Sequence, residues 1–101
     1  TRFYLVVIPI NVSFLSVFIA KICTINVRGF GNAAKQDLIF DYARSGKYDF
    51  VCVQETLAAR PAAIDLLRKS WSGPSFWSPA LGKQGGVCIL VSKDSPFKIE
   101  Q

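Results

Sequence analysis

The sequence predicts an α/β fold in which a strand, a helix and a second strand follow one another along the chain. Two compact apolar runs, KICTINV at residues 21–27 and DFVCVQ at residues 49–54, have the β-branched composition of buried strands. Residues 33–46 between them repeat apolar side chains at helical spacing. A helical crossover of this kind places the two strands parallel in one sheet.

The first predicted helix is bounded by residues with clear positional preferences. Asn32 is a good N-cap, and Gly46 supplies a stop at the other end. The apolar positions between them follow the helical period: Ala34, Leu38, Ile39, Tyr42 and Ala43. We therefore expect this helix to lay one face on the sheet.

A second helix is expected to begin at Pro61, a residue that fits the first helical turn. Its apolar face would carry Ile64, Leu67 and Trp71, and the run 72–74, Ser-Gly-Pro, would end it. For Trp71 and Trp77 we expect core packing rather than base stacking.

Further strands are expected in the last third of the chain. GGVCILVS at residues 85–92 is a third clear strand, and its two glycines form a turn before it. FKIE at 97–100 is a fourth strand, and SFWS at 75–78 is a weaker candidate.

The first twenty residues differ in kind from the rest of the chain, because no charged residue lies between Phe3 and Ala20. This segment is long enough for a marginal membrane span or the apolar part of a signal sequence. Its polar and proline residues oppose a stable span: Pro9, Asn11, Ser13 and Ser16. A leader that is not native to the fold is the third alternative, and the sequence leaves all three open.

The charge balance suits a polyanionic partner, although a plain solvated surface fits it equally well. The chain has 101 residues, with 12 Lys and Arg against 7 Asp and Glu, a net charge of +5. Such an excess favours nucleic acid. Its three cysteines lack the paired spacing of zinc ligands, so we expect buried free thiols of a reducing compartment.

Polar residues gather where the first two predicted strands end. Asn26 lies near the end of the first strand, with Arg28 in the following loop, and Glu55 ends the second strand. Because parallel strands end at the same edge of a sheet, where α/β proteins tend to bind ligands, we expect these residues on one rim. An acid there needs a cation, a hydrogen bond or a metal ion.

Three segments together resemble a known superfamily. Residues 25–29 (INVRG), 49–56 (DFVCVQET) and 85–91 (GGVCILV) resemble the N-terminal half of the endonuclease/exonuclease/phosphatase superfamily. Within it they are most similar to the apurinic-type endonuclease domain of LINE-type non-LTR retrotransposons. The resemblance covers residues 21–101, so the predicted organisation is a hydrophobic leader at 1–20 and an incomplete domain at 21–101.

The resemblance implies a fold and a chemistry. The fold would be a partial four-layered α/β sandwich, and the activity that of a Mg²⁺- or Mn²⁺-dependent phosphodiesterase acting on DNA. Glu55 matches the family's metal-binding, catalytic glutamate, and Asn26 matches the active-site asparagine that helps to position the phosphate. Arg28 would make either a local nucleic-acid phosphate contact or a salt bridge. Without the resemblance, a salt bridge from Glu55 to Arg28 or Lys93 would be the favoured interpretation.

The resemblance stops short of a full catalytic set. Later family motifs, namely a tyrosine, an Asp-x-Asn pair and an Asp-His pair, have no counterpart here, and the chain contains no histidine. We therefore expect a fragment that does not cut DNA alone and whose partner is the missing C-terminal half of the domain. Whether the chain is an enzyme stays open.

The alternative function is that of a small non-catalytic α/β protein that residues 3–20 tether to a membrane. A non-native leader would place the protein in the nucleus or cytoplasm, and a native one would place it in a membrane or the secretory pathway.

Overall fold

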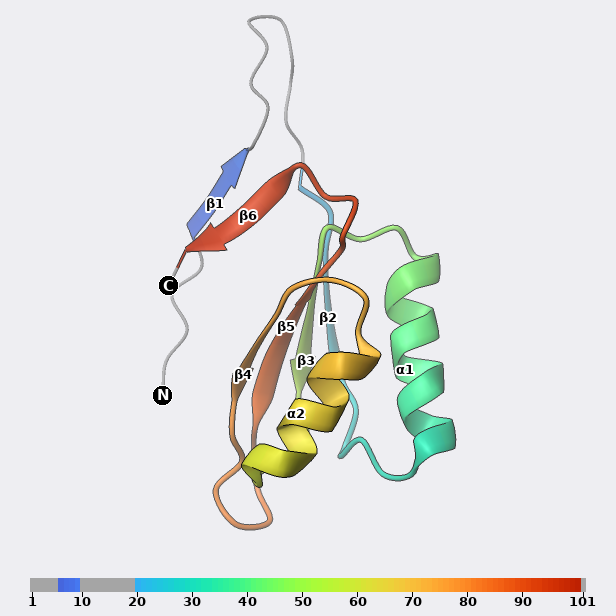
Figure 1. The fold of residues 1–101 in the computed structure, drawn as a ribbon, viewed down its shortest axis with the longest axis vertical. Coiled ribbons are helices and arrows are strands. Elements are labelled where there is room, and N and C mark those ends of the chain that lie inside the picture. The colour runs from blue at the N-terminus through green and yellow to red at the C-terminus, as the bar shows by residue number, and fades with distance from the viewer. Residues whose placement is uncertain (1–5, 10–19, 101) are drawn as a thin grey trace, which may run out of the picture.

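Two helices and a four-stranded mixed sheet make up most of the structure (Figure 1). This computed structural model describes residues 6–9 and 20–100, with side chains for residues 20–97. The elements are β1 (Val6–Pro9), β2 (Ile22–Asn26), α1 (Ala33–Ser45), β3 (Phe50–Gln54), α2 (Pro61–Ser70), β4 (Ser75–Ser78), β5 (Val87–Val91) and β6 (Phe97–Glu100). The predicted α/β class is confirmed, and the arrangement is consistent with part of a layered α/β sandwich.

The main sheet has the strand order β2-β3-β5-β4. β2 and β3 are parallel, as the crossover predicts, with Ile22 opposite Phe50 and Asn26 opposite Gln54. β3 pairs antiparallel with β5, and β5 pairs antiparallel with β4. The short strand β4 was the weakest sequence prediction, and it forms one edge of the sheet.

Helix α1 has the boundaries that the sequence predicts. Asn32 caps it, because its side chain accepts a hydrogen bond of 3.0 Å from the Lys35 N–H. Gly46 follows the last turn with φ −73°, so the left-handed conformation falls instead on Lys47, at φ +53°. Glycine is required at 46 for space, since a Cβ there would overlap the Tyr48 ring.

Helix α2 begins at Pro61 and buries Ile64 and Leu67. Trp71 lies just after the helix as its C-cap and is buried, and its indole N–H donates to the Val91 carbonyl at 2.9 Å. Trp77 packs against the same core, 5.7 Å from the Phe30 ring centroid. Both tryptophans therefore serve packing, as predicted.

Both helices pack on one face of the sheet and form the larger core there (Figure 1). Phe40 on α1 is central, with ring centroids 5.6 Å from Phe30 and 5.8 Å from Trp71. The buried members of this cluster are Phe30, Ile39, Phe40, Ala43, Val51, Val53, Ala58, Ile64, Leu67, Trp71, Cys88 and Leu90. A smaller cluster, comprising Phe50, Ile89, Val91 and Phe97, occupies part of the opposite face.

Strand β1 lies within the predicted leader and pairs antiparallel with β6 in a separate two-stranded ribbon. Residues 1–5 and 10–19 of the leader lie outside the described residues, so the signal, membrane and non-native alternatives are not decided there. Across the part of the chain that the structure describes, no helix has the length and apolar character needed to cross a membrane.

Candidate functional site

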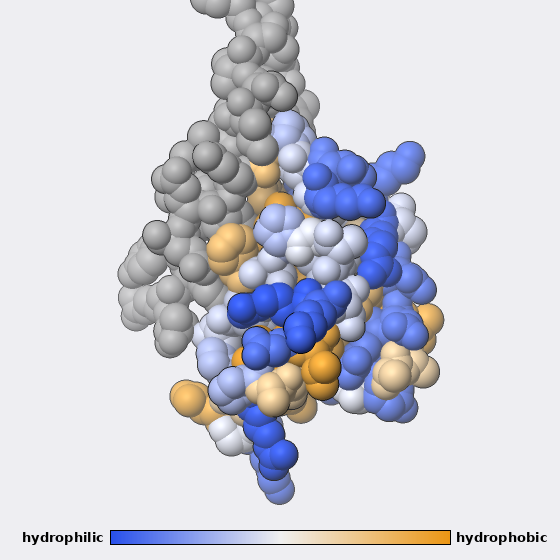
Figure 2. Space-filling view, in the orientation of Figure 1, coloured by the Kyte–Doolittle hydropathy of each residue, from blue (hydrophilic) through white to orange (hydrophobic). Residues whose placement is uncertain are grey.

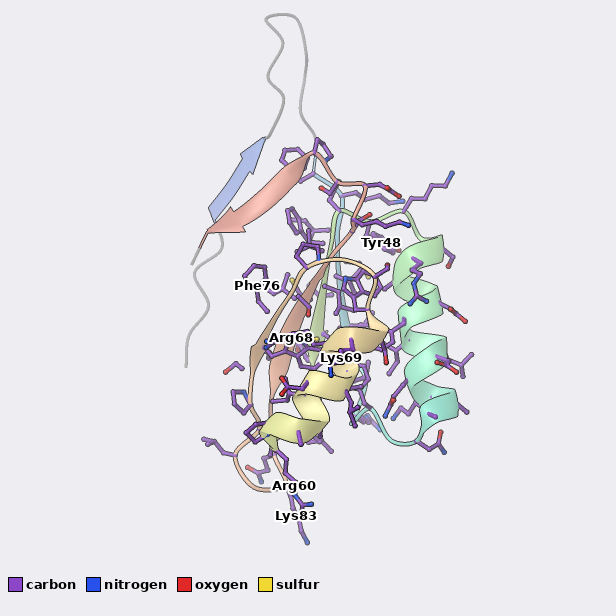
Figure 3. All side chains as sticks on the ribbon, in the orientation of Figure 1. Tyr48, Arg60, Arg68, Lys69, Phe76 and Lys83 are labelled. Atoms are coloured by element: carbon purple, nitrogen blue, oxygen red, sulfur yellow. The ribbon has the colours of Figure 1, made fainter. Side chains whose placement is uncertain are left out.

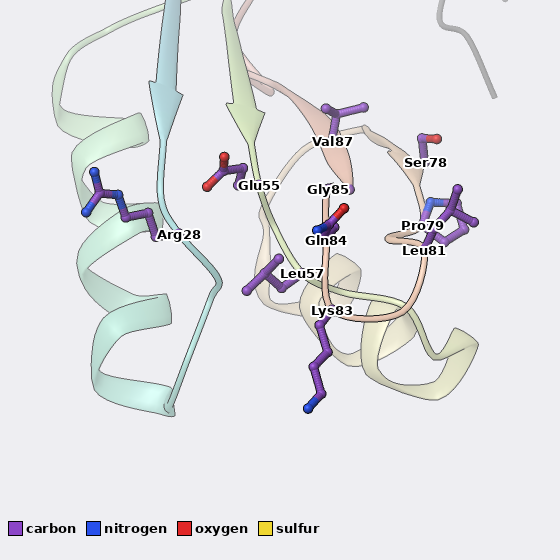
Figure 4. Close-up of a pocket in the computed structure, with 11 residues that line it drawn as sticks. Arg28, Glu55, Leu57, Ser78, Pro79, Leu81, Lys83, Gln84, Gly85 and Val87 are labelled. Atoms are coloured by element: carbon purple, nitrogen blue, oxygen red, sulfur yellow. The ribbon is translucent and has the colours of Figure 1, made fainter.

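The carboxyl ends of β2 and β3 lie side by side at one edge of the sheet (Figure 4). Hydrogen bonding between the two chain segments continues past the strands. The Val27 N–H donates to Gln54 O at 3.1 Å, the Gly29 N–H to Glu55 O at 2.6 Å, and the Phe30 N–H to Thr56 O at 3.2 Å. The loops after β2 and β3 therefore form one continuous rim.

Asn26 ends β2 on this rim and is exposed. Its Oδ1 accepts a hydrogen bond of 3.1 Å from the Arg28 N–H, which closes a tight turn after the strand. The amide NH₂ group of Asn26 has no hydrogen-bond partner among the described residues and keeps two donors for an incoming acceptor.

Glu55 follows β3 directly and is exposed, with its backbone in the left-handed region at φ +53°. Figure 4 shows the Arg28 guanidinium turned away from the Glu55 carboxylate. Within residues 20–97 the only ion pair joins Arg44 and Asp41 on α1, at 3.0 Å. The alternative interpretation of Glu55, a salt bridge to Arg28 or Lys93, does not form, because neither cation lies within ion-pair distance of its carboxylate.

An open hollow of about 950 Å³ adjoins the carboxyl ends of the strands (Figure 4). We call it the rim hollow, and its lining residues are Arg28, Glu55, Leu57, Ser78, Pro79, Leu81, Lys83, Gln84, Gly85, Gly86 and Val87. Arg28, Lys83 and Glu55 are its charged members. Asn26 lies at the same sheet edge but does not line the hollow.

A second, smaller hollow of about 400 Å³ also includes Glu55 in its lining. It runs along β3 and β5, and its lining includes Cys52, Gln54 and Val87. Glu55 thus lies where the two hollows meet, accessible from both.

Basic and apolar side chains project from the same end of the molecule. Arg60 and Lys83 extend from it in Figure 3, and Figure 2 shows hydrophilic and apolar groups interspersed over the visible face. Leu81 in the β4–β5 loop is 87% exposed. This end therefore offers positive charge and apolar contact surface around the Glu55 carboxylate.

Left-handed backbone conformations cluster at the rim hollow. Three non-glycine residues that line it have positive φ: Arg28 at +51°, Glu55 at +53° and Leu57 at +55°. Gly85 and Gly86 also have positive φ, but the turn before β5 falls at Gly82 and Lys83 rather than at the predicted glycine pair. Non-glycine residues rarely adopt this conformation, and such residues concentrate at functional sites.

Sequence reasoning missed the part that Thr56 and Leu57 play in this rim. Thr56 is 2% exposed, and its Oγ1 accepts from the Ala58 N–H at 3.2 Å. Residue type gives no signal for a left-handed Leu57. The adjacent pair Gly85-Gly86 was the available hint that another backbone approaches closely there.

Residues 23–99 match the model of the Endonuclease/Exonuclease/phosphatase family, a span that runs from Cys23 in β2 to Ile99 in β6 and includes the whole rim. The chain belongs to the endonuclease/exonuclease/phosphatase family. No curated protein matches it at a significant level. The family match supports a phosphodiesterase- or nuclease-like hydrolase domain and confirms the predicted superfamily.

Endonuclease/exonuclease/phosphatase members typically depend on a divalent metal ion. Among the described residues, no group of three or more His, Cys, Asp and Glu side chains is placed to share an ion. A single exposed carboxylate, Glu55, nevertheless fits a hydrated Mg²⁺, which keeps several waters and commonly binds through one or two carboxylates and substrate phosphate. The rim does not fit a closed cage of protein ligands.

The three thiols in this endonuclease/exonuclease/phosphatase domain are free, as predicted, but only Cys88 is buried, whereas Cys23 and Cys52 are partly exposed. Burial, and to a smaller extent the nearby Cys52, raises the pKa of the Cys88 thiol. Burial also raises the pKa of Cys52, with a smaller contribution from Cys23. A raised pKa disfavours the thiolate, so neither Cys52 nor Cys88 is an activated nucleophile.

Proposed function

We propose that this chain carries part of the active site of a Mg²⁺-dependent phosphodiesterase that cuts DNA, of the LINE-type retrotransposon class. The observation that carries the proposal is the state of the Glu55 carboxylate. It is exposed at the carboxyl end of β3 and lines the rim hollow together with Arg28 and Lys83. It forms no ion pair with either of these residues. An acid left unpaired beside two cations suits a bound metal and its phosphate better than a structural role.

Each rim residue has a distinct proposed role. Glu55 holds Mg²⁺ or Mn²⁺, and the ion supplies charge stabilisation to the phosphate when bound. The Asn26 amide NH₂ group donates to a phosphate oxygen, since its Oδ1 is already engaged by the Arg28 N–H. Arg28 contacts a neighbouring phosphate, because its guanidinium is not committed to Glu55.

DNA is the proposed substrate because positive charge surrounds the rim. Arg28 and Lys83 line the hollow, Arg60 extends from the same end in Figure 3, and the chain has a net charge of +5. The proposed retrotransposon class rests on the combined sequences of the INVRG, QET and GGV segments. Such a role would require access to nuclear DNA.

We further propose that the chain alone does not cut DNA. It contains no histidine, and Glu55 is the only acid among the residues that line the rim hollow. A general base and a full phosphate clamp would then come from a complementary segment that carries Asp-x-Asn and Asp-His motifs. The alternative of a non-catalytic protein makes a different prediction, since it gives Glu55 no metal.

A Mg²⁺ titration followed by amide NMR tests the metal site. We expect coupled shifts at Glu55 and Asn26 that disappear in Glu55→Gln and persist in Asp37→Asn, a control acid exposed on α1. Shifts that survive Glu55→Gln, or no shift at Glu55 in the wild type, would remove the basis of the proposal and favour the non-catalytic alternative.

A supercoiled-plasmid assay tests the claim of inactivity separately. We expect no nicking by the wild-type chain with Mg²⁺ or Mn²⁺. Metal-dependent nicking that Glu55→Ala abolishes would refute the inactivity while supporting the nuclease assignment.

A further inference from the structure

The segment from Gln54 to Ala58 is braced on both sides by backbone hydrogen bonds. On the β2 side it accepts from the Gly29 and Phe30 N–H groups, at 2.6 and 3.2 Å. On the β5 side it donates, with the Thr56 N–H bound to Gly86 O and the Leu57 N–H bound to Gly85 O, both at 3.0 Å. The Glu55 carboxylate therefore projects from a backbone that both loops hold.

Thr56 is the buried centre of this segment. Its hydroxyl accepts from the Ala58 N–H, and its side chain is 2% exposed. Its two neighbours, Glu55 and Leu57, both have left-handed backbones, at +53° and +55°. Two such departures from ordinary backbone geometry, one on each side of Thr56, persist only where surrounding contacts fix them.

Gly86 meets the Thr56 hydroxyl from the opposite loop. A Cβ added at Gly86 would overlap Thr56 Oγ1 and would also lie 3.2 Å from the Ala80 nitrogen. Gly86 has φ +85°, so both its backbone conformation and its surroundings require glycine. The Thr56 hydroxyl and the Gly86 backbone are thus in close contact, directly next to Glu55 in the chain.

We infer that Thr56 and Gly86 are positioning residues that hold the Glu55 carboxylate in the orientation that binds the metal ion. The inference rests on the proposed function for the identity of what Glu55 binds. It also explains how the rim keeps its backbone geometry. The Thr56 hydroxyl accepts a hydrogen bond from the Ala58 N–H, and the Gly86 carbonyl accepts one from the Thr56 N–H. Substituting a residue that orients a metal-binding carboxylate commonly weakens metal binding.

The test compares Thr56→Val, which keeps the side-chain shape and removes the hydroxyl, with Thr56→Ser, which keeps the hydroxyl. The Mg²⁺ dissociation constant is read from the Glu55 amide shift in the full chain. We expect about tenfold weaker binding in Thr56→Val and affinity close to wild type in Thr56→Ser. Wild-type affinity in Thr56→Val would overturn the inference.

Gly86→Ala is the second variant, with Gly82→Ala as its matched control. Gly82 also has positive φ, +63°, but a Cβ there would meet nothing within 4 Å. We expect Gly86→Ala to weaken Mg²⁺ binding about tenfold and Gly82→Ala to leave it unchanged. If Thr56→Val fails to fold, as judged by circular dichroism, this pair decides the question, and equal effects of the two would overturn the inference.

A metal-free measurement separates this inference from the proposed function. The Cα and Cβ chemical shifts of Glu55 report its backbone conformation without any ion. We expect them to move in Thr56→Val and Gly86→Ala and to stay at wild-type values in Thr56→Ser and Gly82→Ala. Absence of Mg²⁺ binding in the wild type would defeat the proposed function, whereas unchanged Glu55 shifts in both disruptive variants would defeat the positioning role.

Discussion

The Gly29 N–H donates to the Glu55 carbonyl oxygen at 2.6 Å, and this bond joins the loop after β2 to the loop after β3. Gly29 has φ +89° and Glu55 has φ +53°, so both partners leave ordinary strand geometry at the point of contact. The bond extends the parallel pairing beyond the sheet and sets the spacing of the rim. Glu55, the acid at the end of a core strand, is held by its backbone carbonyl, so its carboxylate stays available to bind a ligand.

Gly29→Ala is expected to destabilise the fold by about 1–2 kcal/mol, since a non-glycine residue has a steric penalty at this φ. A Cβ at position 29 would also lie 3.0 Å from Leu57 Cδ1. Urea unfolding measures the effect, and the cost should fall in a Leu57→Ala background because the close contact is removed. An unchanged cost in that background would show that the Leu57 contact contributes nothing.

Asn26→Ala is expected to lower the free energy of unfolding by about 0.5–1.5 kcal/mol, because the Arg28 N–H loses its acceptor. Asn26→Asp keeps an acceptor at the same place and should be closer to wild type. Hydrogen exchange of the Arg28 amide measures the local effect. We expect it to be faster than in the wild type in Asn26→Ala but not in Asn26→Asp. Equal exchange in both variants would contradict this role for Oδ1.

Arg28→Ala and Lys83→Ala are each expected to weaken duplex DNA binding uniformly across sequences. Each removes one phosphate contact, so the slope of log affinity against log salt should fall by about 0.9. Lys47→Ala is the matched control, because Lys47 is exposed after α1 at the opposite end of β3. Fluorescence anisotropy at several salt concentrations measures the slopes. An equal change in the Lys47→Ala control would show that the rim makes no specific contribution to DNA binding.

Phe40→Ala is expected to cost about 3–5 kcal/mol, a large share of the stability of a small domain. Phe40 is 1% exposed and contacts the rings of Phe30 and Trp71. Leu38→Ala on the same helix should change stability by less than about 0.5 kcal/mol, since Leu38 is 71% exposed. Thermal and urea unfolding of the two variants check the contrast.

Stability is expected to fall above about pH 9 because of Cys88. Burial raises the pKa of this thiol above its ordinary value of 9.0, so the folded state keeps a proton that the unfolded state releases. The stabilisation is complete below pH 9 and is lost as the pH rises toward the folded pKa, with a slope of up to about 1.4 kcal/mol per pH unit. Urea unfolding from pH 7 to 10 under reducing conditions should show this slope, and Cys88→Ala should make it less steep, with the raised pKa of Cys52 maintaining part of it.

Local sequence pattern predicted most of the elements correctly. The β-branched run in β2, the cap Asn32 and the N1 residue Pro61 each act over a few neighbouring residues. The parallel pairing of β2 and β3 followed from the helical crossover. The shared edge for Asn26 and Glu55 followed in turn from that pairing.

Other features depend on contacts that no local pattern records. The insertion of β5 between β3 and β4 brings the Gly85-Gly86 segment against Thr56. The pairing of β1 with β6 joins the two ends of the described chain. Side-chain periodicity says which face of a strand is buried, but not which strand lies beside it.

The sequence by itself determined the α/β class, the crossover and the presence of an acid and an amide at the ends of two neighbouring strands, because periodicity and capping are short-range. Only the tertiary structure decided that Arg28, Glu55 and Leu57 adopt left-handed backbones and that Arg28 turns away from Glu55. Hydrogen bonds between loops far apart in the chain hold the backbone at Glu55 and Leu57, and residue type does not encode such bonds for non-glycine positions.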